Sequence, residues 1–301
     1  MNAVAADERR VAIGSVVHPT SRRRLRIGRL LAWTWLAIVV LLIYAPILVI
    51  LGASVDPGQY VMFRAFLQFP PKGFTLHWYM NISPSLWLAV ASSFALAAAV
   101  AMVSVVIGVP AALGLMRGNF PGRNLVATLF RSPLQIPHIV VGVAFLQSSY
   151  LIGIATGVHL HASVVSLFVA HVFVAVPYVI GATGSILGQV SPRLEEAALS
   201  LGASRWRAFR RVTLSLLLPG IFGGALFAFL VSFTDVTIAL FLAPPNFITF
   251  PIRVYSSIQT DLESSLPAVA SLVFLMSAAA IFLVQRLLGI ESVLRSGGAK
   301  G

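Results

Sequence analysis

Long apolar segments alternate with short polar ones over most of the chain. Six of the apolar segments are long enough to cross the hydrocarbon core of a bilayer as helices, which takes about 20 residues each. They begin near Leu30, Leu86, Leu134, Val164, Leu216 and Leu266. Prolines lie within or near the ends of some spans, where membrane helices tolerate a kink if neighbouring groups bind the freed carbonyls. The pattern predicts an all-α, polytopic membrane protein with six transmembrane helices.

Composition agrees with this prediction. Hydrophobic residues make up 58% of the chain and charged residues only 10%, which excludes an ordinary soluble domain. Cysteine is absent, so disulfides and thiolate metal sites are excluded on either side of the membrane.

Basic residues predict the orientation. With the N-terminus in the cytoplasm, all but three of the 21 Lys and Arg residues fall on the cytoplasmic side, and the exceptions are Arg64, Lys72 and Arg253. Both termini are then cytoplasmic. We expect a basic N-terminal tail over residues 1–29, a six-helix transmembrane domain over 30–289 and a cytoplasmic C-terminal tail over 290–301.

A net charge of +12 could also indicate binding to nucleic acid. Two short helices between the fourth and fifth spans superficially resemble a helix-turn-helix, but the spans on both sides leave no room for a third helix or a separate core. Arginines beside membrane spans are explained more simply by topology and by attraction to anionic lipid headgroups. We therefore expect a lipid membrane as a partner and no nucleic acid.

The polar segment between the fourth and fifth spans, about residues 191–214, predicts two short helices in the cytoplasm. Ser191 can cap the first helix, and Glu195 and Glu196 lie in its first turns, where the positive end of the helix dipole favours carboxylates. Gly202 predicts its end, and Ser204 can cap the second. Residues at helical spacing give the first helix a narrow apolar stripe of Leu194, Ala197, Ala198 and Leu201.

This segment resembles a known motif. Glu196-Ala197-Ala198, three residues, Gly202, nine residues and then Val212-Thr213-Leu214 is similar to the EAA loop of binding-protein-dependent ABC importer permeases. The family usually has proline where this chain has Ser215. The resemblance implies a helix that docks into a cleft on a cytoplasmic ATPase subunit. The residues it assigns to ATPase coupling are Glu195, Glu196, Ala197, Ala198, Leu201, Gly202 and Ala203.

The same resemblance implies the rest of the assembly. The fold would be that of a type I ABC importer permease in the bacterial inner membrane. Its partners would be two ATPase subunits, a second permease that is similar or identical, and an extracytoplasmic solute-binding protein. Residues 69–79 and 247–256 look like segments of the polyamine-type branch. The resemblance favours a polyamine solute, with ferric ion, thiamine, a phosphonate or another small organic solute left open.

Ionisable residues within the spans are candidates for a solute pathway, because a charge in hydrocarbon costs several kcal/mol unless it faces a cavity or a partner. Asp235 is the clearest case, and polyamine-type permeases often carry an acid at its position. It could bind a cationic solute or make a structural hydrogen bond to a neighbouring helix. His138 and His171 are more typical of packed residues, and many polyamine-type members have an acid in place of His138. In the last outer loop, Asp261 and Glu263 could contact a binding protein or simply be solvated.

No motif for catalysis or cofactor binding is evident. The two lysines, Lys72 and Lys300, lie outside any phosphate-binding Gly-rich loop, and no zinc-protease or serine-hydrolase motif occurs. We expect a non-catalytic subunit with no cofactor, catalytic residue or metal site. Two alternatives remain: an ion-coupled secondary transporter, which would need paired intramembrane acids, and a non-transporting membrane scaffold, which would need no polar pathway.

Overall fold

The computed structural model describes residues 20–58, 70–260 and 263–288, and these residues contain helices and loops but no strand. Of the tails predicted over 1–29 and 290–301, residues 1–19 and 290–301 lie outside this range, and residues 20–29 form the start of the first helix. The long helices are α1 (Thr20–Val55), α3 (Pro84–Arg117), α5 (His138–Thr156), α6 (Val164–Leu187), α9 (Leu214–Thr234) and α12 (Leu266–Leu288). Short helices connect them: α2 (His77–Met80), α4 (Arg123–Arg131), α7 (Arg193–Ser200), α8 (Arg205–Ala208), α10 (Thr237–Leu242) and α11 (Phe250–Gln259), with a 3₁₀ turn η1 (Ser132–Gln135) and a π-helical turn η2 (Phe209–Thr213).

The helices follow the predicted spans. Five helices in the described residues are long and apolar enough to cross a membrane, and a sixth apolar stretch in α12, Leu266–Phe282, is shorter. The all-α membrane fold is thus confirmed, whereas the count of six spans stays a prediction. The first helix, α1, begins at Thr20, well before the expected start near Leu30, and the third span, expected from Leu134, begins later, because α5 starts only at His138. Pro137 forces extended backbone on Ile136, which separates η1 from α5.

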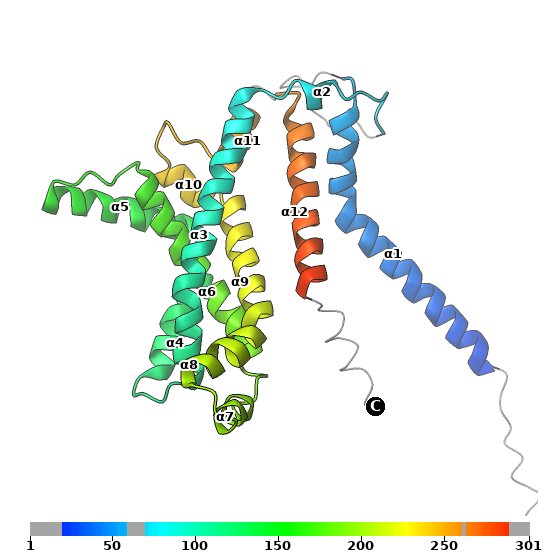
Figure 1. Cartoon of the computed structure of the whole chain (residues 1–301). Helices are drawn as coiled ribbons and strands as arrows, with labels where there is room; N and C mark the ends of the chain where they lie inside the picture. Colours follow the sequence, from blue (N-terminus) through cyan, green and yellow to red (C-terminus); the bar gives the residue numbers. More distant parts are fainter. Residues whose placement is uncertain (1–19, 59–69, 261–262, 289–301) are drawn as a thin grey trace, which may run out of the picture.

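The core of the molecule is a bundle of α3, α6 and α9, which Figure 1 shows side by side. Val179 of α6 lies between two glycines of the neighbouring helices. A Cβ added to Gly108 of α3 would lie 2.8 Å from the Val179 Cβ, and one added to Gly224 of α9 would lie 2.8 Å from the Val179 Cα. Because lipid offers no hydrophobic drive for helix association, such close backbone packing is what holds membrane helices together.

The helix α1 pairs with α12 beside this bundle, and its N-terminal half slants away from the other helices in Figure 1. Much of its apolar surface is exposed, as expected for a helix that faces lipid or another membrane subunit. The pair is held at one end by the Tyr79 hydroxyl, which hydrogen bonds to Ser54 and to Ser271, each at 2.7 Å. A residue of the predicted outer segment 69–79 therefore joins α2 to both helices.

The short helices lie at two opposite ends of the bundle (Figure 1). We call the end with α7 and α8 the loop end, and the end with α2 and α11 the opposite end. At the opposite end, the backbone carbonyl of Asp56 accepts a hydrogen bond from the Trp78 indole at 2.8 Å, and its buried carboxylate accepts one from the Lys72 amide at 3.2 Å. The second predicted outer segment, 247–256, is tied to α3 by the Phe250 amide, which donates to Ser93 Oγ at 2.8 Å.

Candidate coupling loop and transport pathway

The helix α7 is short, exposed and ended by a specific turn. Gly202 has φ +86°, and the Gly202 and Ala203 amides donate to the carbonyls of Leu199 and Ala198, both at 3.0 Å. This pair of bonds is the Schellman motif, in which glycine is favoured because the left-handed backbone is strained for other residues. The predicted helix end at Gly202 is confirmed.

The predicted caps had different outcomes. The α7 helix begins at Arg193, and Pro192, not Ser191, occupies the N-cap position with helical dihedral angles. The Leu194 amide donates to the backbone carbonyl of Ser191, so the predicted side-chain cap at Ser191 is wrong. The Ser204 cap is confirmed, since its hydroxyl accepts a hydrogen bond from the Arg207 amide at the start of α8.

The Glu195 carboxylate points into the protein and ties the loop to the bundle. Its Oε2 accepts hydrogen bonds from Arg117 Nη1, at the end of α3, at 2.7 Å and from the buried Thr213 Oγ1 at 2.5 Å. The hydrogen bond from Thr213, and then that from Arg117, lowers the pKa of Glu195 below its usual value. The neighbouring Glu196 is exposed. The two adjacent carboxylates therefore have different environments.

A hollow of about 300 Å³ lies between the end of α7 and the start of the next span. Two exposed apolar side chains lie at this end, Leu201 with 89% and Trp206 with 67% of their surface accessible. The residues that line the hollow are small, apolar or basic: Ala198, Leu201, Gly202, Ala203, Arg207, Ala208, Arg211 and Val212. Four of the predicted coupling residues thus share one concave surface.

Ser215, which replaces the proline usual in the family, lies in the second position of α9. The chain runs from α8 through η2 into α9 as one continuous helix, Arg205–Thr234. A proline would remove one backbone donor here, whereas serine keeps it. The wider turn at η2 is a π-bulge, a feature that changes the direction of side chains within a helix.

Asp235 lies at the break between α9 and α10. It ends α9, and its Oδ1 accepts the Ile238 amide of α10 at 2.7 Å. Its Oδ2 hydrogen bonds to His138 Nδ1, at the start of α5, at 2.5 Å. His171 Nε2 of α6 lies 3.6 Å from Asp235 Oδ1. The carboxylate therefore connects three elements that lie far apart in the sequence.

Burial differs strongly within this cluster. The side chain of His171 is fully buried, that of Asp235 is 3% exposed and that of His138 is 37% exposed. His171 Nδ1 lies 3.2 Å from Ser232 Oγ, while its Nε2 has no hydrogen-bond partner among the described residues. The sequence reasoning treated both histidines as packed residues and missed this cluster. The signal in the sequence that could have indicated the cluster was the presence of these three ionisable residues in or beside three different apolar spans.

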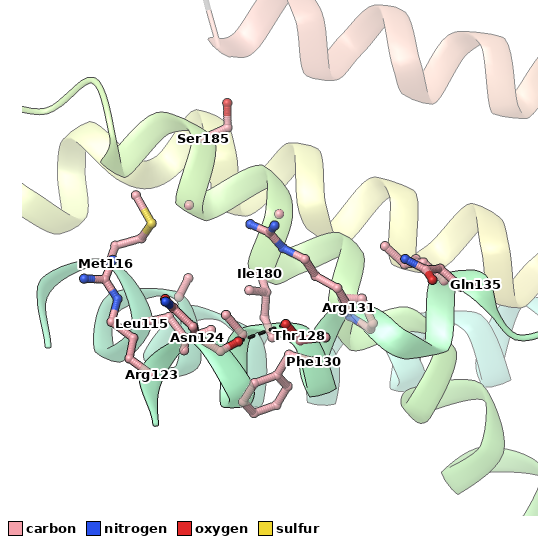
Figure 2. A pocket seen from close by; sticks show the side chains of 16 residues that line it. Leu115, Met116, Arg123, Asn124, Thr128, Phe130, Arg131, Gln135, Ile180 and Ser185 are labelled. Carbon is pink, nitrogen blue, oxygen red and sulfur yellow. Dashed lines mark hydrogen bonds between the residues drawn. The ribbon is translucent and has the colours of Figure 1, made fainter. Parts of the chain in front are cut away.

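A cavity of about 780 Å³ lies between α3, α4 and α6 and is shown in Figure 2. It lies toward the loop end, because α4 follows the end of α3 closely. Its polar lining comes mainly from α4 and η1, and includes Arg123, Asn124, Thr128, Arg131 and Gln135. The Thr128 hydroxyl donates to the Asn124 carbonyl at 2.9 Å, the dashed line in the figure. Sequence reasoning did not find this cavity, and Asp235 does not line it.

In the last outer loop, Glu263 is not simply solvated. Its carboxylate lies 3.6 Å from Arg253 Nη2 and accepts a hydrogen bond from Ser265 at 3.0 Å. Asp261, predicted with it as a possible contact for a binding protein, lies outside the described residues. No group of three His, Cys, Asp or Glu in the described residues is arranged to hold a metal ion.

A helical membrane bundle with a short exposed helix between two spans and a buried carboxylate at a broken helix is the arrangement of a transport permease subunit. Comparison with known proteins agrees. Residues 104–290 match the family described as binding-protein-dependent transport system inner membrane component, and the chain belongs to this family. It is therefore an inner-membrane protein of the ABC importer type.

Relatives extend the match over most of the chain. The chain is 30% identical to the putrescine transport system permease protein PotI of Escherichia coli K12, over 79% of this chain and 85% of the relative. It is 29% identical to the spermidine/putrescine permease PotC of Haemophilus influenzae, over 81% and 90%. A molybdate/tungstate permease, WtpB of Thermococcus kodakarensis, is 32% identical over a shorter region, 56% of this chain and 64% of the relative.

A solved structure supports the fold. A bacterial ABC transporter involved in alginate import matches 89% of this chain and 97% of its own chain with a TM-score of 0.63 and 16% identity. At this identity the likeness supports the fold alone.

Proposed function

We propose that this chain is the non-catalytic permease subunit of a polyamine importer, which forms part of the solute pathway and is driven by separate ATPase subunits through α7. A second permease, similar or identical, and an extracytoplasmic solute-binding protein complete the assembly. The family membership supports the importer class. The observation that carries the coupling role is the way α7 is anchored on one side and exposed on the other.

The anchoring is suited to transmitting force. Glu195 ties α7 to Arg117 at the end of α3 and to Thr213 at the start of the long helix that includes α9. A push on α7 therefore acts on two helices of the core bundle at once. The hollow beside it, with the exposed Leu201 at its edge, offers an apolar surface for an ATPase subunit. In this proposal α7 lies in the cytoplasm.

The pathway role rests on Asp235. The described spans themselves contain no Asp or Glu, and Asp235 directly follows the span Arg205–Thr234, at the break between α9 and α10. Broken helices at membrane depth are tolerated where they line a cavity, and they recur at the solute sites of transporters. A carboxylate at such a break favours a cationic solute over an oxyanion. The polyamine permeases PotI and PotC cover most of the chain, whereas the molybdate/tungstate permease covers just over half.

The two alternatives are less well supported. A secondary transporter driven by protons or sodium would pair Asp235 with another acid, but its neighbours in the described structure are histidines. A scaffold without transport would need no buried ionic cluster at a helix break.

The coupling role is tested with a charge in the hollow. Ala198→Glu places a carboxylate where the ATPase is proposed to dock, and Ser200→Glu places the same charge on the same helix outside the hollow. We expect Ala198→Glu to abolish solute-stimulated ATP hydrolysis in membranes while the protein still inserts, and Ser200→Glu to lower it less than twofold. Equal coupling in both variants would contradict the proposed docking surface.

The solute is tested by uptake of radiolabelled putrescine, with molybdate as the oxyanion control. Asp235→Asn removes the charge with almost no change in shape. We expect it to lower putrescine uptake at least tenfold without lowering the amount of inserted protein. Normal putrescine uptake in the variant would assign Asp235 a structural role, and uptake of molybdate in place of putrescine by the unaltered protein would overturn the polyamine assignment.

A further inference from the structure

We propose that His138 is a tethered competitor for the cationic solute: its imidazole occupies the Asp235 carboxylate in the resting permease and must leave before the solute can bind there. The idea rests on the proposed function, in that Asp235 is taken to bind the solute. It adds a residue that sets the affinity of this site.

The geometry gives His138 this position. Its Nδ1 lies 2.5 Å from Asp235 Oδ2, while Oδ1 is already used by the Ile238 amide. The carboxylate is only 3% exposed, so a solute cannot reach it while these partners stay in place. Of the side chains that contact the carboxylate, His138 alone is accessible, at 37%, whereas His171 is fully buried. Among these contacts, the place of His138 is therefore the accessible side of the Asp235 carboxylate.

His138 can leave without unfolding its surroundings. It is the first residue of α5 and its side chain is 37% exposed, so a change of side-chain rotamer is enough to move the imidazole away from Asp235. The exchange also conserves hydrogen bonds, because an ammonium N–H of the solute replaces one imidazole N–H on Oδ2. The solute brings the positive charge that a buried carboxylate needs. When a neutral imidazole departs, only a hydrogen bond to the carboxylate is lost, whereas the departure of an imidazolium breaks an ion pair.

A permanent cation at this position would oppose solute binding, because it has the same sign as the solute and is held against the same oxygen. The other titratable side chains on the packed elements α5, α6, η1, α9 and α10 in the described residues are His171, Tyr150 and Tyr178. Tyr150 stacks on His161, and Tyr178 stacks on Phe227. His171 is therefore the side chain with which His138 has to be compared.

The test measures putrescine binding directly, since uptake also depends on the separate binding protein. The purified transporter complex in nanodiscs, without binding protein, is titrated with radiolabelled putrescine. We expect the Kd of His138→Gln to be several-fold lower than that of the unaltered complex, because the competing imidazole is removed. His138→Lys, a permanent cation, should abolish binding. His171→Gln and the distant His159→Gln should leave the Kd within twofold of the unaltered value.

The outcomes separate this proposal from the proposed function. An unchanged Kd in His138→Gln overturns the role of His138, while a loss of binding in Asp235→Asn still supports the pathway. Equal binding by Asp235→Asn and the unaltered complex, or no binding by either, contradicts both. A second measurement needs no substitution: putrescine should increase the modification of His138 by diethylpyrocarbonate at pH 7, because the imidazole is displaced into solvent. Protection of His138 by putrescine would overturn the proposal.

Discussion

The tie between Glu195 and the bundle predicts that removing one carboxylate loosens α7 while the rest of the protein stays folded. In Glu195→Ala, the buried Thr213 hydroxyl loses its charged acceptor and Arg117 loses its ion pair. Hydrogen bonds to charged groups contribute about 1.5–3 kcal/mol and partly exposed ion pairs about 0.2–1 kcal/mol, so we expect a local loss of about 2 kcal/mol. At about 1.4 kcal/mol per tenfold, the opening equilibrium of α7 rises roughly thirtyfold.

Amide hydrogen exchange over α7 measures this opening directly. The chain supplies a matched control, because Glu196→Ala removes the adjacent carboxylate from the same first turn and so changes the helix dipole interaction equally. Glu196 is exposed and outside the tie. We expect exchange of the α7 amides to rise roughly thirtyfold in Glu195→Ala and less than threefold in Glu196→Ala. Equal exchange in the two variants would refute the assignment of Glu195 as the anchor.

Acid has a smaller effect on this tie than the ordinary behaviour of glutamate would suggest. Hydrogen bonds from Thr213 and Arg117 lower the pKa of Glu195 in the folded protein. The stabilisation is therefore complete above the usual pKa of glutamate and is lost only as the pH falls through the lower folded value. Exchange of the α7 amides, corrected for intrinsic rates, should be unchanged between pH 7 and pH 5. A marked loosening already at pH 5 would contradict the ionised tie.

Two glycine substitutions test the packing and the turn. Gly224→Ala should destabilise the bundle by about 1–3 kcal/mol, because its Cβ would meet the Val179 Cα at 2.8 Å. The control Gly223→Ala places its Cβ in open space and should be neutral or stabilising. Thermal unfolding in detergent compares the two variants, and equal melting temperatures would contradict the close approach. Gly202→Ala should lower coupled ATP hydrolysis through backbone strain of about 1–2 kcal/mol at φ +86°, even though its Cβ meets no atom within 4 Å, and Gly202→Asn, which tolerates this conformation better, should restore part of it.

Apolar periodicity was enough to place the helices, because a span must satisfy all its backbone groups internally and so requires a long apolar run. The predicted starts at Val164 and Leu266 coincide with α6 and α12. The start near Leu134 did not, because hydrophobicity alone does not register that Pro137 separates a 3₁₀ turn from α5. Gly202 likewise allowed the end of α7 to be predicted correctly, because glycine favours the left-handed turn there. The start of α7 depended on which backbone carbonyls accept hydrogen bonds from its first amides.

The site was predicted in part. Asp235 was identified as the significant charge, since an acid in a span is expensive and rarely accidental. Its partners could not be found from the sequence, because His138 and His171 lie on helices whose contact depends on tertiary packing. The inward direction of Glu195 was hidden for the same reason: the position of Arg117, 78 residues away, decides it. Sequence indicated which residues carry chemistry, and packing determined how they pair.

The central claim is that α7 docks onto a separate ATPase, and crosslinking from Leu201 tests it most directly. The chain contains no cysteine, so Leu201→Cys introduces a single thiol at a side chain that is 89% exposed beside the hollow. His77→Cys places a matched thiol on exposed α2 at the opposite end. After treatment of native membranes with a short thiol-to-amine crosslinker, we predict an adduct between Leu201→Cys and a nucleotide-hydrolysing subunit, identified by mass spectrometry, and none from His77→Cys. A Leu201→Cys thiol that is fully reactive yet captures no ATPase would contradict the account.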